Sequence, residues 1–156
     1  MIARTTFESP VGHINLTADG ETIIELSMTK TPGPSLGSAK VLKEAQKQLS
    51  EYFKGKRKDF TFKHEARGTK FQQSVWNEIA RIPFGEVISY ADIAREIGKP
   101  QASRAVGGAV GSNPIPLIIG CHRVLGASGK ITGYSGGEGI PTKRWLLKLE
   151  HIETKD

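Results

Sequence analysis

The chain has 156 residues, of which 37% are hydrophobic, and its formal net charge is +6. This length is enough to bury a hydrophobic core in one domain or in two small lobes. A single cysteine excludes an internal disulfide and a cysteine-based zinc cluster, so we expect a reducing location. We also expect no metal and no cofactor. No signal-peptide core follows Met1 and no apolar run approaches the ~18 residues of a bilayer span, so we expect a cytoplasmic protein that does not contact membranes.

The first third of the chain predicts a small antiparallel sheet followed by one helix. Alternating apolar residues separated by the turns SPVG and ADGE predict strands over residues 5–7, 13–17 and 22–28. After a Pro, Gly and Ser loop, apolar residues recur at helical spacing from Ser38 to Phe53. Residues 54–68 are typical of a linker. We therefore place a domain boundary near Gly68, with an N-terminal lobe over residues 1–67 and a C-terminal lobe over residues 68–156.

Positive charge is spread over both lobes and favours a polyanionic partner such as nucleic acid. The one dense basic cluster is KGKRK at residues 54–58. We interpret it as a solvated loop in preference to a dedicated DNA contact.

The C-terminal lobe begins with three predicted helices. Thr69 is placed to cap the first, which ends at Pro83 and Gly85. Ser89 and Asp92 have the spacing of a capping box for the second, and the third is expected over about residues 103–112. The last two, joined by a short turn, are typical of a helix-turn-helix. The fold class predicted from both lobes is α+β.

The third of these helices is composed almost entirely of small residues. Each interior glycine costs about 0.5–1 kcal/mol relative to alanine, so a close approach of some other surface must offset that cost. The surface is either a neighbouring helix or a groove of DNA. Arg104, a single large cation at the start of this helix, favours DNA.

The stretch IIGCHRVL, residues 118–125, contains the lone cysteine followed directly by a histidine. A lone cysteine is often an inert core residue, but an adjacent imidazole increases the thiolate fraction. Side chains of successive strand residues point to opposite faces, so Cys121 and His122 cannot touch unless the backbone turns or a water bridges them. The last predicted helix is PTKRWLLKLEHI, residues 141–152, with Trp145, Leu146 and Leu149 on one side. Glu150 is the only carboxylate of this helix before its fraying end. We expect a relay of Cys121, His122 and Glu150 that activates the thiol.

The C-terminal lobe resembles the O6-alkylguanine-DNA alkyltransferases, also called methylated-DNA–protein-cysteine methyltransferases. The resemblance rests on FQQSVWNEIARIPFGEVISYADIA, on RAVGGAVGSNPIPLIIGCHRVLGASGKITGYSGG and on the final LLKLE. It implies DNA repair by a single-turnover transfer of an alkyl group from O6-alkylguanine in double-stranded DNA to a cysteine. The alternatives are a non-catalytic damage sensor, a thiol hydrolase that turns over, and a plain transcriptional regulator. We expect a monomer.

The resemblance also implies roles for individual residues. Cys121 would accept the alkyl group, His122 would deprotonate it through a water, Glu150 would orient His122, and Tyr90 would help guanine depart. Arg104 would fill the gap left by the flipped nucleotide, within a minor-groove surface formed by Ser103, Arg104, Ala105, Gly107 and Gly108. Asn113 would be the hinge between the recognition helix and the active-site loop. The guanine pocket would be lined by Val124, Tyr134 and Ser135.

One residue departs from the family's usual PCHR motif, because Gly120 stands where the family has proline. If φ at residue 120 is close to −65° and its N–H is unbonded, Gly120→Pro is expected to stabilise the protein modestly. We expect this outcome because the flanking residues follow the family without insertion or deletion.

Overall fold

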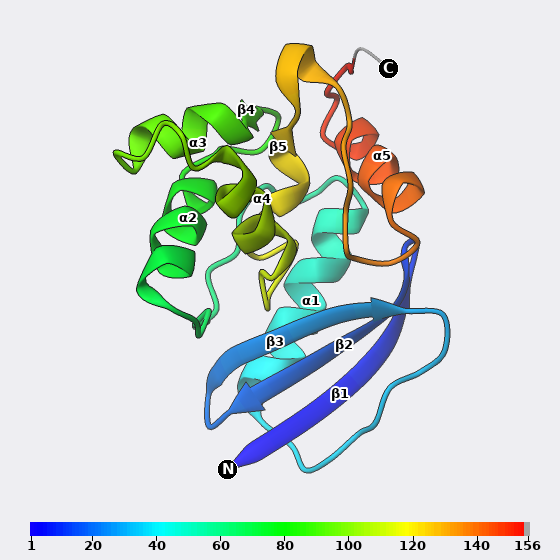
Figure 1. Cartoon of the computed structure of the whole chain (residues 1–156). Coiled ribbons are helices and arrows are strands. Elements are labelled where there is room, and N and C mark those ends of the chain that lie inside the picture. Colours follow the sequence, from blue (N-terminus) through cyan, green and yellow to red (C-terminus); the bar gives the residue numbers. More distant parts are fainter. Residues whose placement is uncertain (155–156) are drawn as a thin grey trace.

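Three strands at the start of the chain form an antiparallel sheet in the order β1-β2-β3 (Figure 1). They are β1 (Ile2–Ser9), β2 (Gly12–Asp19) and β3 (Thr22–Thr29). The structure is a computed structural model that describes residues 1–154. The three predicted strands are confirmed, and each extends beyond the predicted residues. Side chains of alternate residues, including Ile14, Leu16 and Ile23, are buried on one face of the sheet.

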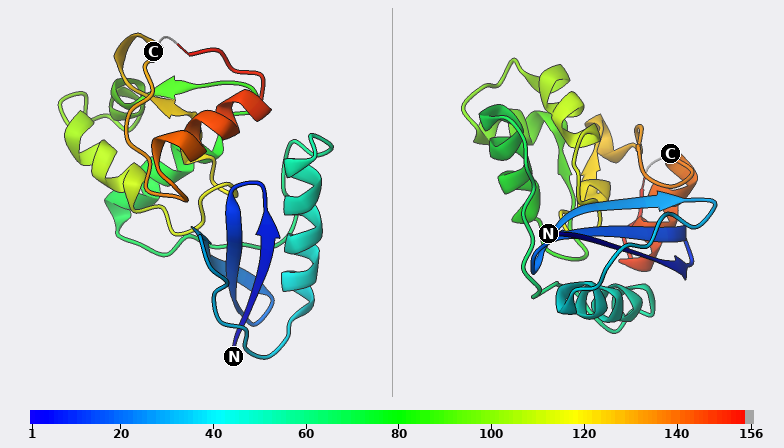
Figure 2. Two further views of the ribbon diagram at one scale, coloured as in Figure 1. Left: turned by 90° about the vertical axis from the view of Figure 1, so that its right-hand side faces the viewer. Right: turned by 90° about the horizontal axis from the view of Figure 1, so that it is seen from below.

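Helix α1 (Lys40–Phe53) packs against the sheet and closes the first core (Figure 2). It begins at Lys40, two residues later than predicted. Its N-cap residue makes no side-chain hydrogen bond. Instead, the Glu21 carboxylate in the turn between β2 and β3 accepts hydrogen bonds from the N–H groups of Lys40 and Val41, at 3.1 and 3.0 Å. A carboxylate from another element therefore satisfies backbone donors that a cap residue usually satisfies.

The predicted linker, residues 54–68, runs in part alongside the sheet. The N–H of Ile23 donates to the carbonyl of Lys63 at 3.0 Å, and the N–H of Glu65 donates to the carbonyl of Ile23 at 2.9 Å. Phe62, within this segment, is buried in the core. These contacts fix the path of the chain from α1 to the helical part.

Up to residue 154, the helical part contains four α-helices and a parallel pair of two-residue strands. The helices are α2 (Lys70–Ala80), α3 (Tyr90–Glu96), α4 (Ser103–Gly111) and α5 (Ile140–Leu149). The strands are β4 (Ile88–Ser89) and β5 (Val124–Leu125). Both predicted N-terminal caps are confirmed: Thr69 and Gln72 form a capping box on α2, and Ser89 and Asp92 form one on α3. These caps fix where α2 and α3 begin, and thus the start of the helix-turn-helix.

Helix α5 buries part of the predicted face, since Leu146 is buried and Leu149 packs against the core, but the buried face is centred on other residues. Leu146 is fully buried as expected, but Trp145 is 36% exposed, and the other buried side chains of the helix are Thr142, Lys143 and Leu147. The apolar pattern of the sequence therefore missed that a lysine lies on the inner face.

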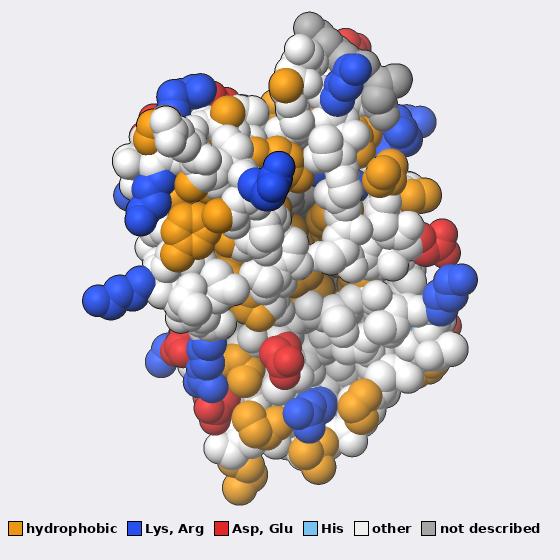
Figure 3. All heavy atoms as spheres, viewed as in Figure 1, with side chains coloured by type: hydrophobic (Ala, Val, Ile, Leu, Met, Phe, Trp, Pro, Cys, Tyr) orange, Lys and Arg blue, Asp and Glu red, His pale blue; other side chains and the backbone are white. Residues whose placement is uncertain are grey.

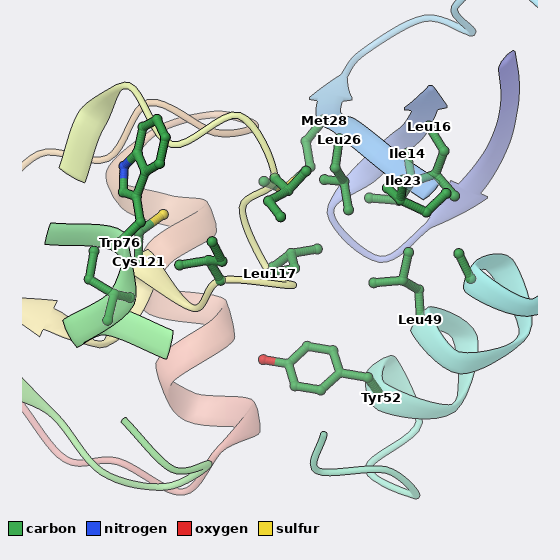
Figure 4. Close-up of a cluster of buried hydrophobic side chains, with 14 of the residues drawn as sticks. Ile14, Leu16, Ile23, Leu26, Met28, Leu49, Tyr52, Trp76, Leu117 and Cys121 are labelled. Carbon is green, nitrogen blue, oxygen red and sulfur yellow. The ribbon is translucent and has the colours of Figure 1, made fainter. Parts of the chain in front are cut away.

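A continuous cluster of buried side chains joins the two parts of the chain (Figure 4). It runs from the sheet and α1 through Leu117 to Trp76 and Cys121. The N–H of Leu26 in β3 also donates to the carbonyl of Pro114, at 2.9 Å. The sheet thereby supports the loop that leads to Cys121.

None of the helices in the described part of the chain has the length and hydropathy needed to cross a bilayer.

Candidate active site

The backbone turns at the lone cysteine. Cys121–Arg123 form a single 3₁₀ turn between the loop after α4 and β5. The preceding loop is fixed by Asn113, whose side-chain amide donates to the carbonyl of Ile119 at 2.8 Å and whose Oδ1 accepts from the N–H of Ile115 at 3.0 Å. Because Cys121 and His122 lie in a 3₁₀ turn and not in a strand, their side chains are not forced onto opposite faces. Asn113 therefore ties the end of α4 to the cysteine loop.

Glu150, at the end of α5, collects five hydrogen bonds in the interior of the protein. His122 Nε2 lies 2.5 Å from Oε2, and Arg123 donates through Nε to Oε1 at 2.8 Å and through Nη2 to Oε2 at 3.0 Å. The hydroxyl of Tyr52 donates to Oε2 at 2.6 Å, and the N–H of Gly85 donates to Oε1 at 3.0 Å. The side chains of His122 and Glu150 are fully buried. Such a carboxylate has its acceptor sites filled and its charge balanced by the Arg123 guanidinium.

This arrangement determines the protonation of His122. Burial alone raises the pKa of Glu150, but the hydrogen bonds from His122 and Arg123 outweigh burial and hold that pKa well below its usual range. Burial lowers the pKa of His122, against the opposing effect of Glu150. An ionised carboxylate only accepts hydrogen bonds, so the proton of the neutral imidazole lies on Nε2. The basic lone pair of His122 is therefore on Nδ1, a buried atom that has no hydrogen-bond partner in residues 1–154.

The thiol of Cys121 is buried beside three polar groups. Burial raises its pKa, whereas the side chain of Asn113, the cation of Lys143 and the Tyr134 hydroxyl lower it. Lys143 is fully buried and donates from Nζ to the carbonyl of Val124 at 2.6 Å. Burial lowers the pKa of Lys143 to about 8, although the nearby thiol acts in the opposite direction. The thiol thus needs a base to ionise, and the lysine cation stabilises the thiolate once it forms.

A cavity of about 730 Å³ opens between α4 and the chain that leads into α5, and Cys121 forms part of its wall. Of the residues predicted at the site, it is lined by Tyr90, Ser103, Arg104, Gly107, Tyr134 and Ser135. Figure 3 shows this hollow, with hydrophobic side chains in its depth and Lys and Arg side chains spread over the helices beside it. The volume is in the range of pockets that accept small organic groups.

Helix α4 presents its small residues to the outside. Arg104, Ala105 and Gly108 are exposed, and a Cβ atom added at Gly108 or at Gly111 would meet nothing within 4 Å. At Gly107 the nearest atom would be a ring carbon of Tyr90, at 4.0 Å. Tight packing against a neighbouring helix therefore does not explain these glycines. An external surface that approaches the backbone of α4 does explain them.

One predicted pocket residue lies elsewhere in the structure. Four residues that the sequence did not single out belong to the site, and one of them lines the cavity. Val124 is fully buried in β5 and does not line the cavity. Thr132 lines it and donates a hydrogen bond to the Tyr90 hydroxyl at 2.9 Å. The other three are Arg123, Lys143 and Tyr52, which lie behind the cavity wall. Arg123 belongs to the CHRV motif, but nothing in the local pattern around Tyr52 or Lys143 distinguishes either from a core or surface residue.

Gly120 meets both conditions set for its replacement by proline, yet the surroundings reverse the expected effect. Its φ is −73°, and no hydrogen bond from its N–H is found within residues 1–154. However, a Cβ atom at residue 120 would lie 2.8 Å from Nη1 and 3.0 Å from Cζ of Arg123. That guanidinium is held by Glu150 and by a 2.9 Å hydrogen bond to the carbonyl of Ile82. The sequence-based expectation of a stabilising proline is therefore withdrawn.

We expect Gly120→Ala to destabilise the protein by about 1–3 kcal/mol, because its Cβ overpacks a fixed guanidinium. Gly120→Pro is expected to destabilise somewhat less, since restriction of the unfolded chain returns about 0.4–1 kcal/mol. Thermal and urea unfolding of the three proteins measures both effects. An alanine variant as stable as the wild type would show that the Arg123 guanidinium moves aside freely.

Fold and site together define a class of protein: a helix-turn-helix protein that places a single buried cysteine, with a histidine and glutamate pair behind it, in a cavity beside the second helix. Two family descriptions match the chain. "6-O-methylguanine DNA methyltransferase, DNA binding domain" matches residues 70–152, and "6-O-methylguanine DNA methyltransferase, ribonuclease-like domain" matches residues 2–66. The chain belongs to the 6-O-methylguanine DNA methyltransferase family.

Individual relatives match over nearly the whole chain. A methylated-DNA–protein-cysteine methyltransferase of Methanosarcina acetivorans is 46% identical over 150 residues, which cover 92% of this chain and 95% of the relative. A constitutive enzyme of the same name from Bacillus subtilis is 38% identical, over 97% of both chains. The solved structure of Mycobacterium tuberculosis OGT in complex with DNA has a TM-score of 0.85 and 45% identity, and covers 94% of this chain and 91% of that one.

Proposed function

We propose that the protein repairs alkylated DNA by moving an alkyl group from O6 of guanine to the thiol of Cys121. The thiolate attacks the alkyl carbon in line with the C–O6 bond. The C–S bond forms as the C–O6 bond breaks, and the electron pair of the broken bond leaves with guanine. The product is a thioether, which water does not cleave, so each molecule acts once. The displacement as written uses only the thiolate, the alkyl carbon and the departing guanine.

The proton of the thiol leaves through His122. We propose that Nδ1, the unpartnered basic atom of the ring, receives this proton through one water molecule. Glu150 stays ionised throughout, because its five donors stabilise its charge, and it holds the imidazolium as it forms. The departing guanine gains one proton in place of the alkyl group, so the proton count balances. Tyr90, at the cavity wall with its hydroxyl bonded to Thr132, is the residue we propose to assist this departure.

The DNA contact is assigned to α4. Its exposed small residues would let the backbone enter the minor groove, with Ser103, Arg104, Ala105, Gly107 and Gly108 along the contact. O6 of guanine is not accessible within a stacked duplex, so the nucleotide must flip out into the cavity, at a cost of a few kcal/mol. Asn113 would hold α4 and the cysteine loop in register, and Tyr134 and Ser135 would bound the base. We further propose that the protein consists of the two lobes predicted from the sequence, divided near Gly68, and acts in the cytoplasm on genomic DNA.

The position of Cys121 in the wall of a cavity beside α4 carries this proposal. The test is the intact mass of the protein after incubation with a duplex that contains O6-methylguanine. A gain of one methylene unit, retained on Cys121 after peptide mapping, is expected. No gain in mass would contradict the proposal and would favour the alternative of a non-catalytic sensor. Continued product formation beyond one equivalent would favour the thiol hydrolase.

A further prediction concerns Arg104, which is exposed at the start of α4 and lines the mouth of the cavity. If it fills the gap left by the flipped nucleotide, Arg104→Ala should slow repair of duplex DNA by about 10- to 100-fold, corresponding to the few kcal/mol of flipping. Reaction with a free O6-alkylguanine base, which needs no flipping, should change little.

Single-turnover rates on both substrates measure the effect of Arg104→Ala. Arg81→Ala is the matched control, because the side chain of Arg81 is 76% exposed and does not line the cavity. If Arg104→Ala slowed both substrates equally, Arg104 would instead support the pocket or the fold.

A further inference from the structure

The N-terminal part of the chain contributes one polar atom to the buried relay. Tyr52, in the last turn of α1, is fully buried. Its hydroxyl donates to Glu150 Oε2 at 2.6 Å and lies 3.4 Å from His122 Nε2. The other donors to Glu150 come from residues 85, 122 and 123, all of which lie beyond Gly68. Figure 4 shows the Tyr52 side chain reaching from α1 toward α5.

The packing around Tyr52 explains its aromatic ring but does not explain its hydroxyl. Its ring packs against Phe53, Phe60 and Phe84, with centroid distances of 5.6, 5.7 and 6.1 Å. All three neighbours are phenylalanines, and a fourth phenylalanine would fill the same volume. The hydroxyl is thus explained by its contact with Glu150 rather than by packing.

The hydroxyl acts on the same carboxylate oxygen as His122. Burial and the charge of Glu150 raise the pKa of Tyr52 far above its usual value, so the hydroxyl keeps its proton and donates a hydrogen bond to Oε2. The Tyr52 hydroxyl, His122 and Arg123 all hydrogen-bond to Oε2, so only one orientation of the carboxylate satisfies every donor. Without the hydroxyl, the carboxylate loses one of the contacts that fix this rotation, and the imidazole loses part of its support.

We propose that Tyr52 is a positioning residue for alkyl transfer: its hydroxyl, supplied by the N-terminal part of the chain, fixes the orientation of the Glu150 and His122 pair. This inference rests on the proposed roles of Cys121, His122 and Glu150. It also assigns a function in catalysis to the sheet and α1, which otherwise lie away from the cavity. Tyr52 does not touch the thiol or line the cavity, so it acts through Glu150.

The test is Tyr52→Phe in the full chain, with two readouts. Single-turnover transfer should slow by about tenfold, close to the lower end of the range for loss of a hydrogen bond to a charged group. The slowing should be equal for duplex DNA and for a free O6-alkylguanine base, because the relay serves both. In the substrate-free protein, the NMR signal of the His122 Nε2–H proton should shift, since the hydroxyl shares its acceptor.

Phe60→Leu is the matched control, because Phe60 contacts the same ring but makes no contact with Glu150. It should leave the His122 signal and the transfer rate near those of the wild type, even if it lowers the melting temperature. The inference is overturned if Tyr52→Phe changes only one readout or neither, or if Phe60→Leu slows transfer as much. Failure of the wild type to transfer would instead contradict the proposed function, whereas the His122 signal needs no substrate.

Discussion

Replacement of Cys121 by serine is expected to abolish alkyl transfer, with a loss of at least about 10³-fold, while DNA affinity stays close to that of the wild type. The change is small in volume, and Cys121 is only 4% exposed, so the outer face of α4 is unaffected. A hydroxyl, however, is far harder to ionise than a thiol, and the His122 base cannot make it an effective nucleophile in this buried position.

The chain contains one cysteine, which makes this test unusually direct. No second thiol can accept the alkyl group, so intact mass after incubation with methylated duplex should remain unchanged for Cys121→Ser. Fluorescence anisotropy on the same duplex measures the affinity. Transfer at the wild-type rate by the serine variant would remove Cys121 from the mechanism, whereas lost affinity would mean that the thiol supports the DNA surface.

The helices and strands were predictable where local chemistry determines them. The capping boxes at Thr69 and Ser89 depend on residues three positions apart, and the apolar spacing of α1 depends on residues within one helix. The start of α1 was not predictable, because it is set by Glu21 in a distant turn. Leu117 was not predictable either: it has φ of 75°, a conformation that costs a non-glycine residue about 1–3 kcal/mol and that only the folded surroundings maintain.

The same distinction holds for the site: features encoded within one segment were predictable, and features that depend on contacts between distant segments were not. The motif around Cys121 and the carboxylate near the end of the last predicted helix indicated the three residues of the relay, and the structure brings His122 and Glu150 into contact. The burial of Lys143 depends on how α5 packs against β5, and the contact of Tyr52 with Glu150 depends on how α1 meets the end of α5. No pattern within a single helix reports either. The same holds for Gly120. The backbone conformation of Gly120 agreed with the sequence-based expectation. The effect of replacing Gly120 on stability is decided by the Arg123 guanidinium packed against it.

Glu150→Gln is expected to damage both stability and activity. Glutamine has nearly the same shape but no charge, so the buried guanidinium of Arg123 loses its counter-ion. In either orientation of the amide, its NH₂ must face at least two of the five donors. Breaking a buried ion pair in this way costs about 3–5 kcal/mol, and loss of the carboxylate that fixes the histidine tautomer lowers the transfer rate by about 10²- to 10⁴-fold. Urea unfolding and single-turnover transfer measure the two effects, with the exposed Glu153→Gln as the matched loss of charge.

The pH dependence of stability separates this ion pair from a packing effect. The pKa of Glu150 is lower in the folded protein than in the unfolded chain. Its contribution to stability is therefore fully present above the unfolded value of about 4.3 and is lost as pH falls toward the folded value. The difference in unfolding free energy between the wild type and Glu150→Gln should be constant near neutral pH and narrow below about pH 4. A difference that stayed the same down to the acid limit of folding would mean that the glutamine variant is weakened by altered packing, and that the charge of Glu150 does not hold His122 and Arg123 in place.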